Sequence, residues 1–430
     1  MRKLMQEQVK IDVWGGAGEH GRACYRVQAG EHSVLLDCGG KKEQGGLYPS
    51  IVPEQAQALQ AVFLSHAHED HMAALPLLLK HGYAGDIWLT RETHRQLFKY
   101  ANAWRNYVEK HGKTLPYAYS DWDRLSCRFL DEEAEQGEWL TIKPGLKMCW
   151  GPSGHLPGAV WLLLELEGQL IYYSGDYSSE SAVLQAALPD QALLAGRKLA
   201  AAIVDAAYGA AQSSQQSLVQ ELLLKIDQVY QRGGHILLPV PLYGRGLDLL
   251  LVLNEQLAHI PLAAEASLVK EWERLLQAED ASLWLRTGSQ ARLRHALSKV
   301  RTVAAAEERQ KLVTDEPPHI ILAPDAMMLA EPASSYGKLL MDDAQHAILF
   351  TGHVSADVAM PAAMKCEAAS YLYKVHQGLP DVQRMLGELK PQQVLLVHAN
   401  AKATEQLVHE LKQLGFGAQS EHFFLPYRQS

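Results

Sequence analysis

The sequence has little cysteine, and its cysteines are poorly arranged for cross-links or for a cysteine metal site. Only five occur among 430 residues, and no two of them have Cys-x-x-Cys spacing. An odd, scattered set argues against a disulfide framework and against a zinc knuckle. We therefore expect reduced thiols, mostly in the core, and a cytoplasmic protein.

Long hydrophobic runs are also missing. No stretch approaches the roughly 20 apolar residues that a membrane-spanning helix needs, so no membrane role is expected. The segment 1–8 carries charge but no apolar core, which is not the pattern of a secretory signal. Hydrophobic residues at 47% and charged residues at 21% are typical of a globular protein. The length favours two domains, or one large domain with an insertion.

The chain has no basic excess. Lys and Arg number 40 against 49 Asp and Glu, which gives a formal charge of −9. Proteins that coat long nucleic acids usually carry a surplus of Lys and Arg. Nucleic-acid binding by this chain would therefore depend on a local groove or on bound metal ions.

Histidine and aspartate, by contrast, are concentrated in one short segment. Residues 65–71 read Ser-His-Ala-His-Glu-Asp-His, after the apolar run 61–64 and before the helical pattern of 72–80. This order predicts a strand, a loop rich in metal ligands and a helix. Imidazole and carboxylate are donors that Zn²⁺ prefers. On such a loop, His66 and His68 can face one metal while Asp70 and His71 face a second.

Short strands and helices alternate along the chain, which indicates a layered α/β architecture. The predicted strands lie at 9–14, 23–27, 33–36, 146–151, 160–167, 169–173, 200–204, 319–323, 346–351 and 393–397. Helices are predicted at 53–59, 72–81 and 91–109, and residues 307–315 are expected to form an exposed helix or a linker. The middle of the chain repeats helix 214–231, strand 235–241, a glycine turn and helix 247–259, which is typical of parallel crossovers.

Further histidines and aspartates follow predicted strands. They are Asp37, His155, Asp176, Asp205 and His398. The ends of strands gather at one rim of a sheet, where α/β proteins place their sites. Each residue alone is as readily explained as a cap, a turn former or a core residue. Together with the cluster at 66–71, they predict a binuclear metal site.

The order of these residues resembles the metallo-β-lactamase-fold hydrolases of the β-CASP group, in their RNA-processing branch. That branch includes ribonuclease J and the endonuclease of the cleavage and polyadenylation machinery. The resemblance extends from about Val9 to His398. Asp37, the cluster at 66–71, His155 and Asp176 match the first four motifs of the family in turn. Motifs A, B and C are matched by Asp205, His376 and His398.

The resemblance implies an α/β fold, namely a metallo-β-lactamase αββα sandwich with an inserted β-CASP cap domain. It places the first part of the lactamase domain at residues 1–208. The cap would span 209–373, and the lactamase domain would resume at 374–430.

The resemblance also assigns residues to two zinc ions per chain. His66, His68 and His155 would hold one ion, Asp70, His71 and His398 would hold the other, and Asp176 would bridge them. Asp37 would orient the ligands by hydrogen bonds. The catalytic residues would be Asp70, Asp205 and His376, with His376 held by Asp205 and donating a proton to the leaving oxygen. His20, in a glycine-rich loop, and Arg245, in a Gly-Arg-Gly turn, are candidate substrate contacts.

This site implies a zinc-dependent phosphodiesterase, first of all a ribonuclease of endo or 5′-exo mode that uses a hydroxide activated by two metals. The histidine at motif C resembles that of the RNA-processing branch and favours RNA as the substrate, which we expect to be single-stranded. One alternative is a DNA nuclease or another phosphoester hydrolase on the same fold. Another is a non-catalytic subunit of an RNA-processing complex. The complete set of metal ligands argues against this second alternative. A homodimer is plausible for the group.

The expected cap departs from the family pattern. Pro324–Met328 replaces a Ser-Gly-Met type of turn, and Gly352–Asp357 replaces a Gly-Tyr loop that ends in Gly-Thr. Small residues let backbone N–H groups approach phosphates closely. We therefore expect a changed nucleic-acid track in the cap, and we expect no appended RNA-binding domain.

Overall fold

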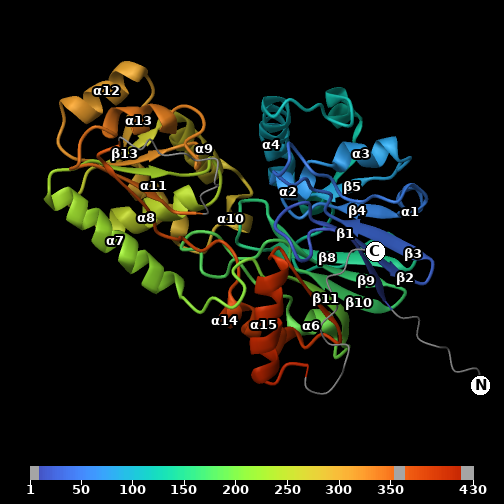
Figure 1. Cartoon of the computed structure of the whole chain (residues 1–430). Coiled ribbons are helices and arrows are strands. Elements are labelled where there is room, and N and C mark those ends of the chain that lie inside the picture. The colour runs from blue at the N-terminus through green and yellow to red at the C-terminus, as the bar shows by residue number, and fades with distance from the viewer. Residues whose placement is uncertain (1–8, 353–363, 418–430) are drawn as a thin grey trace, which may run out of the picture. The chain divides into compact units, whose positions relative to one another are not determined.

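The structure is a computed structural model that describes residues 9–352 and 364–417. The chain divides into two compact units. The first comprises Met1–Ser179, Ala186–Gln212 and His376–Ser430, and the second comprises Glu180–Gln185 and Ser213–Val375. The second unit is thus inserted in the first (Figure 1). The segment Glu180–Gln185 of the second unit was not anticipated, and the expected boundaries near 208 and 373 stay a prediction.

The first unit contains two six-stranded sheets. In order, the strands of the first sheet are β1 (Lys10–Gly15), β2 (Cys24–Ala29), β3 (His32–Leu36), β4 (Ala61–Phe63), β5 (Ile87–Leu89) and β6 (Cys127–Phe129). Those of the second are β18 (Val394–Val397), β11 (Leu199–Asp205), β10 (Gln169–Tyr173), β9 (Val160–Leu166), β8 (Leu146–Pro152) and β7 (Leu140–Lys143). The predicted hairpin is confirmed, since β2 and β3 pair antiparallel with Ala29 opposite His32.

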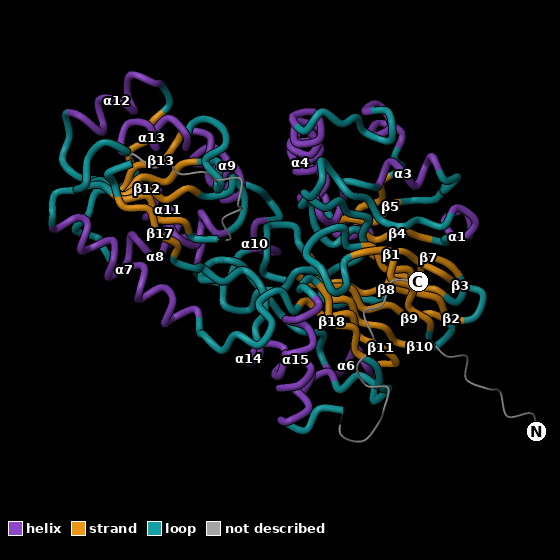
Figure 2. Tube along the Cα trace, viewed as in Figure 1, coloured by secondary structure: helices purple, strands orange, loops and turns teal. Residues whose placement is uncertain are grey.

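Helices cover the outer face of each sheet. The helices of this unit are α1 (Pro53–Gln57), α2 (Glu69–Met72), α3 (Leu75–Lys80), α4 (Arg91–Lys110), η1 (Tyr119–Arg124), α5 (Leu130–Glu133), α6 (Gln191–Leu194), α14 (Leu379–Leu389) and α15 (Ala401–Gln413). Figures 1 and 2 show α3 and α4 on one side of the paired sheets and α6 and α15 on the other. Among the described residues, no helix is long and apolar enough to cross a membrane.

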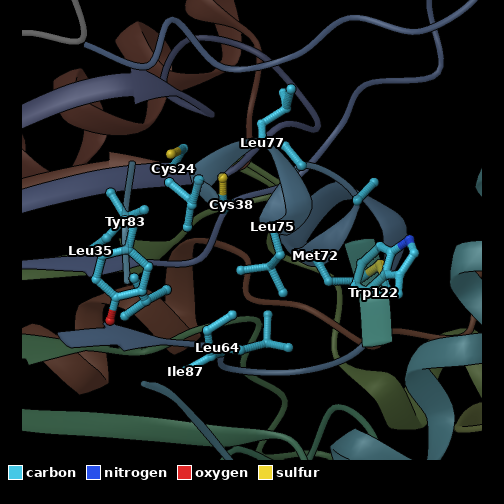
Figure 3. Close-up of a cluster of buried hydrophobic side chains, with 14 of the residues drawn as sticks. Cys24, Leu35, Cys38, Leu64, Met72, Leu75, Leu77, Tyr83, Ile87 and Trp122 are labelled. Carbon is cyan, nitrogen blue, oxygen red and sulfur yellow. The ribbon is translucent and has the colours of Figure 1, made fainter. Parts of the chain in front are cut away.

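Apolar side chains that alternate along the strands account for these layers. Leu35 and Val62 of the first sheet pack in one cluster with Leu75 and Trp104 from the helices; Figure 3 shows part of it around Leu35, Leu64 and Ile87. A second cluster joins the other sheet to α14 and α15. The inner faces meet through the rings of Tyr25 and Tyr173, whose centroids are 5.9 Å apart. The expected αββα sandwich is therefore confirmed.

In its described residues, the second unit has one six-stranded sheet in the order β14 (Arg301–Val303), β13 (Leu262–Glu265), β15 (Ile320–Ala323), β12 (Ile236–Pro239), β16 (Ala347–Phe350) and β17 (Glu367–Ser370). Every neighbouring pair is parallel, as the repeated helix–strand pattern predicted. Its helices are α7 (Gln215–Gln231), α8 (Arg245–Gln256), α9 (Ala266–Gln277), α10 (Ala281–Trp284), α11 (Ser289–Leu297), α12 (Ala306–Thr314) and α13 (Ala333–Leu340). Of the altered segment Gly352–Asp357, residues 353–357 lie outside the described residues.

One predicted helix is wrong in a way that matters for the site. Instead of one helix over 72–81, the structure has α2, which begins at Glu69, and α3, which begins at Leu75. Pro76 lies in the first turn of α3; it has no N–H to donate to the carbonyl oxygen of Met72, and its ring would clash with that carbonyl, so one helix cannot run through this point. As a result Asp70 and His71 lie on a short helix, not on an open loop.

Candidate metal centre

The helical turn that carries Asp70 and His71 is held by its carbonyl groups. The N–H groups of Gly40, Ala23 and Cys38 donate to the carbonyl oxygens of Glu69, Asp70 and His71 at 2.8–2.9 Å. Gly39 makes this approach possible, because a Cβ there would lie 1.7 Å from the carbonyl oxygen of Asp70. The first two motifs of the sequence are thereby fixed against each other through the backbone.

Four side chains form a first set of converging donor atoms. His68 Nδ1 lies 3.1 Å from both His66 Nε2 and His155 Nε2. Asp176 Oδ2 lies 3.4 Å from His66 Nε2 and 3.5 Å from His155 Nε2. The donors of a tetrahedral zinc site, with bonds near 2.0–2.1 Å, are separated by about 3.3 Å. This set therefore fits a single tetrahedral metal ion.

A second set shares Asp176. Its other oxygen, Oδ1, lies 3.3 Å from His71 Nε2, and Asp70 Oδ2 lies 3.0 Å from His398 Nε2 and 3.7 Å from His71 Nε2. His71 Nε2 is buried and makes no hydrogen bond with any described residue. A buried nitrogen without a hydrogen bond is costly unless a further partner is present, and a metal ion is such a partner. The carboxylate of Asp176 thus faces both sets.

His376 and Asp205 form a pair next to both sets. His376 Nδ1 lies 3.1 Å from Asp205 Oδ2 and 3.8 Å from Asp176 Oδ2. Asp205 is fully buried, and it also accepts hydrogen bonds from the N–H groups of Tyr177 and Ala207. Its Oδ1 lies 3.7 Å from His398 Nδ1, so one carboxylate borders two histidines.

Asp37 contacts one histidine of the second set directly and one histidine of the first set through Ser65. Its Oδ2 lies 2.7 Å from His71 Nδ1 and accepts from the hydroxyls of Ser65, at 2.7 Å, and of Tyr173. Ser65 Oγ in turn lies 3.0 Å from His66 Nδ1. Asp37 therefore orients His71 directly and His66 through one hydroxyl, which leaves the Nε2 atom of each ring for the metal side.

Two of these residues have left-handed backbone. Asp37 has φ +57° and His398 has φ +66°. For residues other than glycine this region costs about 1–2 kcal/mol, and such conformations gather at functional sites. His398 N donates to the carbonyl oxygen of Gly16, which helps to hold the strained residue in place.

The side chains of the cluster differ in their protonation, because burial and neighbouring charges shift their pKa values in different directions. Burial and the charges of neighbouring histidines lower the pKa values of His66 and His68 well below the usual range, so both rings are neutral donors. Burial alone would raise the pKa of Asp176, but the positive charges of His398 and His71 hold it well below its usual range. A carboxylate and neutral imidazoles such as those of His66 and His68 are the states that bind a divalent cation. Burial alone would lower the pKa values of His71 and His398, but the charge of Asp176 raises both well above the usual range, so these two rings must release a proton when an ion binds.

The structure brings together the residues that the sequence predicted. The donor groups comprise His66, His68, His155 and Asp176 in one group, Asp70, His71 and His398 in another, and Asp176, Asp205, His376 and His398 in a third. The ring of His20 lies 5.8 Å from that of His398. Arg245 belongs to the second unit, at the start of α8, where its Nε donates to Thr351 Oγ1 at 3.1 Å.

Sequence reasoning missed the partners of the ligands. Ser65 directly precedes the histidine cluster, and Tyr173 ends the strand before Asp176, but neither position distinguishes a hydroxyl that binds Asp37 from a core residue. Tyr100, whose ring lies 5.1 Å from that of His68, comes from the middle of α4 and gave no signal at all.

Comparison with known proteins agrees with this geometry. The family profile of the metallo-beta-lactamase superfamily matches residues 17–227, and that of the Beta-Casp domain matches residues 219–357. A Protein of Unknown Function from Enterococcus faecalis V583 has a similar crystal structure, with a TM-score of 0.55 over 93% of this chain and 96% of that one, at 13% identity.

Three curated relatives are informative. Transcription termination factor FttA of Methanocaldococcus jannaschii is 28% identical over 80% of this chain and 56% of its own length. Probable RNase MJ4 of the same organism is 24% identical over 95% of this chain and 97% of its own. Endoribonuclease ysh-1 of Neurospora crassa is 29% identical over 56% of this chain and 28% of its own.

The chain thus spans a little over half the length of FttA. The fold, the order of the motifs and the two matching profiles all indicate the same family. The chain belongs to the metallo-β-lactamase superfamily, in the group that carries an inserted β-CASP domain.

Proposed function

We propose that the protein is a metal-dependent ribonuclease with two zinc ions per chain. The observation that carries this proposal is Asp176, whose two oxygens face separate donor sets beside the His376–Asp205 pair. Relatives named as an RNase and an endoribonuclease support RNA as the substrate. Single-stranded RNA, a cytoplasmic location and a homodimer stay predictions.

Zinc is the metal we propose because imidazole dominates the donor set. The first set offers three imidazole nitrogens and one carboxylate oxygen, a composition and geometry that suit zinc. Asp176 would bridge, and Asp70, His71 and His398 would complete the second site. When bound, two such ions would activate a water molecule and neutralise negative charge on the phosphate.

His376 is the residue we propose for proton transfer to the leaving oxygen. Its Nδ1 faces Asp205 at 3.1 Å, which leaves Nε2 as the nitrogen that can donate to a substrate. Burial alone would raise the pKa of Asp205, but the charge and hydrogen bond of His376 hold it well below its usual range. The Asp205 carboxylate fixes the orientation of the His376 ring, so that Nε2 is the nitrogen that would transfer the proton in general-acid catalysis. Asp70 would act as a ligand, and His20 and Arg245 as substrate contacts.

The test is hydrolysis by the zinc-loaded protein of end-labelled RNA, single-stranded DNA and bis-p-nitrophenyl phosphate. We expect RNA cleavage at least tenfold faster than in an Asp70→Ala/His71→Ala variant. His376→Gln should keep its zinc and lose about 100-fold in rate, whereas exposed His409→Gln should match the wild type. RNA cleavage no faster than in the double variant would refute the proposal.

A DNA nuclease or another phosphoester hydrolase is the second candidate. The observation that favours it is the second unit's loop after β15, where Pro324–Met328 replaces a small-residue turn. Cleavage of DNA or of the small ester without cleavage of RNA would select it.

A further inference from the structure

Three partly exposed rings surround the metal centre, and each contacts a different histidine of the cluster. The rings of Tyr100 and His68 are 5.1 Å apart at 82°, and those of Tyr208 and His376 are 5.5 Å apart at 84°. The ring of His20 lies 5.8 Å from that of His398 at 77°. These nearly perpendicular contacts come from three separate segments of the first unit.

Tyr100 has an unusual position for a half-exposed aromatic residue. It lies on the packed face of α4, where the neighbouring turns carry Gln96 and Trp104, both with 0% exposure. A tyrosine at the centre of such a face is normally covered. Tyr100 is only partly buried: it packs against the core of the unit, and its ring lies 5.1 Å from that of His68.

Tyr208 is fixed through its backbone. Its N–H donates to the carbonyl oxygen of Gln377, the residue after His376, at 3.1 Å. Asp205, three positions before Tyr208, accepts from His376 and from the N–H of Ala207. The half-exposed ring of Tyr208 is therefore held beside the histidine that we propose as proton donor.

The charge of the chain makes these rings significant. With a formal charge of −9, the protein has no general excess of cations to hold a phosphate backbone. Aromatic side chains bind single-stranded nucleic acid differently, because every base has a face that can stack on a ring. Two rings set around one metal centre can hold the bases next to a bound phosphate without such an excess.

We propose that Tyr100 and Tyr208 are stacking platforms for the two bases that flank the scissile phosphate. This inference rests on the proposed ribonuclease function and specifies how its substrate is held. Tyr208 takes the base on the leaving-group side, because it adjoins His376, and Tyr100 takes the base on the other side. Recognition is then tolerant of sequence and selective for unpaired strands.

The test compares Tyr100→Leu and Tyr208→Leu with Tyr100→Phe and Tyr208→Phe. Tyr107→Leu is the matched control, since Tyr107 is a half-exposed tyrosine of the same helix that stacks on Trp104 at 5.8 Å. The KM for RNA oligonucleotides, the rate on bis-p-nitrophenyl phosphate, which has no bases, and the zinc content are measured for each protein. A second series of oligonucleotides carries one abasic nucleotide on either side of the cleaved bond.

We expect each leucine variant to raise the KM for RNA about tenfold relative to the small ester, and each phenylalanine variant to restore it. An abasic nucleotide on the matching side should abolish the effect of one leucine variant but not of the other. An equal loss of activity on RNA and on the small ester would show that the rings only support the histidines, and it would overturn the inference. A change in the KM for RNA no larger than that caused by Tyr107→Leu would overturn it as well. No RNA cleavage by the wild type would instead refute the proposed function itself.

Discussion

Asp37 shows how one buried side chain can orient ligands in both donor sets. Its carboxylate accepts from the backbone N–H and hydroxyl of Ser65, and from Tyr173, and it faces His71. Burial, and then the charge of Asp37, raise the pKa of Tyr173 well above its usual range, so this hydroxyl stays protonated and donates. The position of both histidine rings therefore depends on Asp37 and on the hydroxyl groups that hold it, none of which belongs to a donor set.

Tyr173→Phe is expected to lower zinc affinity about tenfold, because outer partners of metal ligands typically contribute this much. The adjacent Tyr172 is the matched control: its buried hydroxyl has no hydrogen-bond partner among the described residues, so Tyr172→Phe should leave zinc affinity unchanged. Zinc titration against a chelating dye measures both. Equal affinities for wild type and Tyr173→Phe would contradict this role.

At the scale of elements, α4 links two parts of the site. Its N-cap residue Thr90 accepts from the N–H of Thr93 at 3.1 Å and donates to the carbonyl oxygen of Gly158 at 2.8 Å. Thr93 Oγ1 donates to the same carbonyl at 2.9 Å. Gly158 lies in the turn that carries His155, so the start of the helix also holds a ligand loop.

Thr90→Ala should therefore lower the free energy of unfolding by about 2 kcal/mol, the upper end for a helix cap. Ser214 caps α7 through the N–H of Ser217 and is exposed, so Ser214→Ala is expected to cost only about 0.5–1 kcal/mol. Urea denaturation of both variants measures the difference. A larger loss of unfolding free energy in Ser214→Ala than in Thr90→Ala would show that the hydrogen bonds to Gly158 add no stability.

The second unit's sheet carries a buried histidine cluster at the starts of three neighbouring strands. His235, His319 and His346 precede β12, β15 and β16. His235 Nδ1 accepts from the N–H of His319, and the N–H of His235 donates to His346 Nδ1. Burial, and then the charges of His346 and His319, lower the pKa of His235 to about 4. Asp343 and Arg232 border His346, and Arg301 borders His319.

Acid should therefore destabilise this unit. The pKa of His235 is lower in the folded protein than the roughly 6.5 of the unfolded chain, so the unfolded chain binds more protons. Its contribution is lost as the pH falls from about 6.5 to about 4, by at most about 3 kcal/mol. Thermal unfolding between pH 7.5 and 4 should show a shallower decline for His235→Asn than for the wild type. The exposed His259→Gln variant should follow the wild type.

At the scale of the whole molecule, all predicted metal ligands belong to one unit, although they come from both sides of the insertion. His398 reaches the cluster only because β18 pairs with β11 in parallel, which returns the chain to the sheet that also carries Asp205. Strand β18 thus completes the sheet of the first unit, and we expect metal binding to stabilise this unit.

Zinc binding is expected to stabilise the first unit selectively, because a ligand stabilises the state that binds it. Hydrogen exchange with and without a chelator should show slower exchange in the loaded protein for β11, β18 and the segment around α2. The strands of the second unit should exchange at unchanged rates. Equal protection of β12 and β15 would contradict this separation.

The sequence by itself determined which donor atoms the centre can offer. The cluster at 66–71 and the histidines and aspartates after apolar strands predicted a binuclear site, because donor identity and strand periodicity are both visible in one dimension. The layered α/β fold and the parallel sheet of the second unit followed from the same periodicity.

Only the tertiary structure decided the orientation of the side chains that carry the donor atoms. Tyr173 and Asp37 are 136 residues apart in sequence, and their bond exists because two sheets pack face to face. The left-handed backbone of Asp37 and His398 and the partial exposure of Tyr100 likewise result from packing. Local sequence specifies which atoms can bind a metal, whereas long-range packing specifies which of their lone pairs and ring faces remain available.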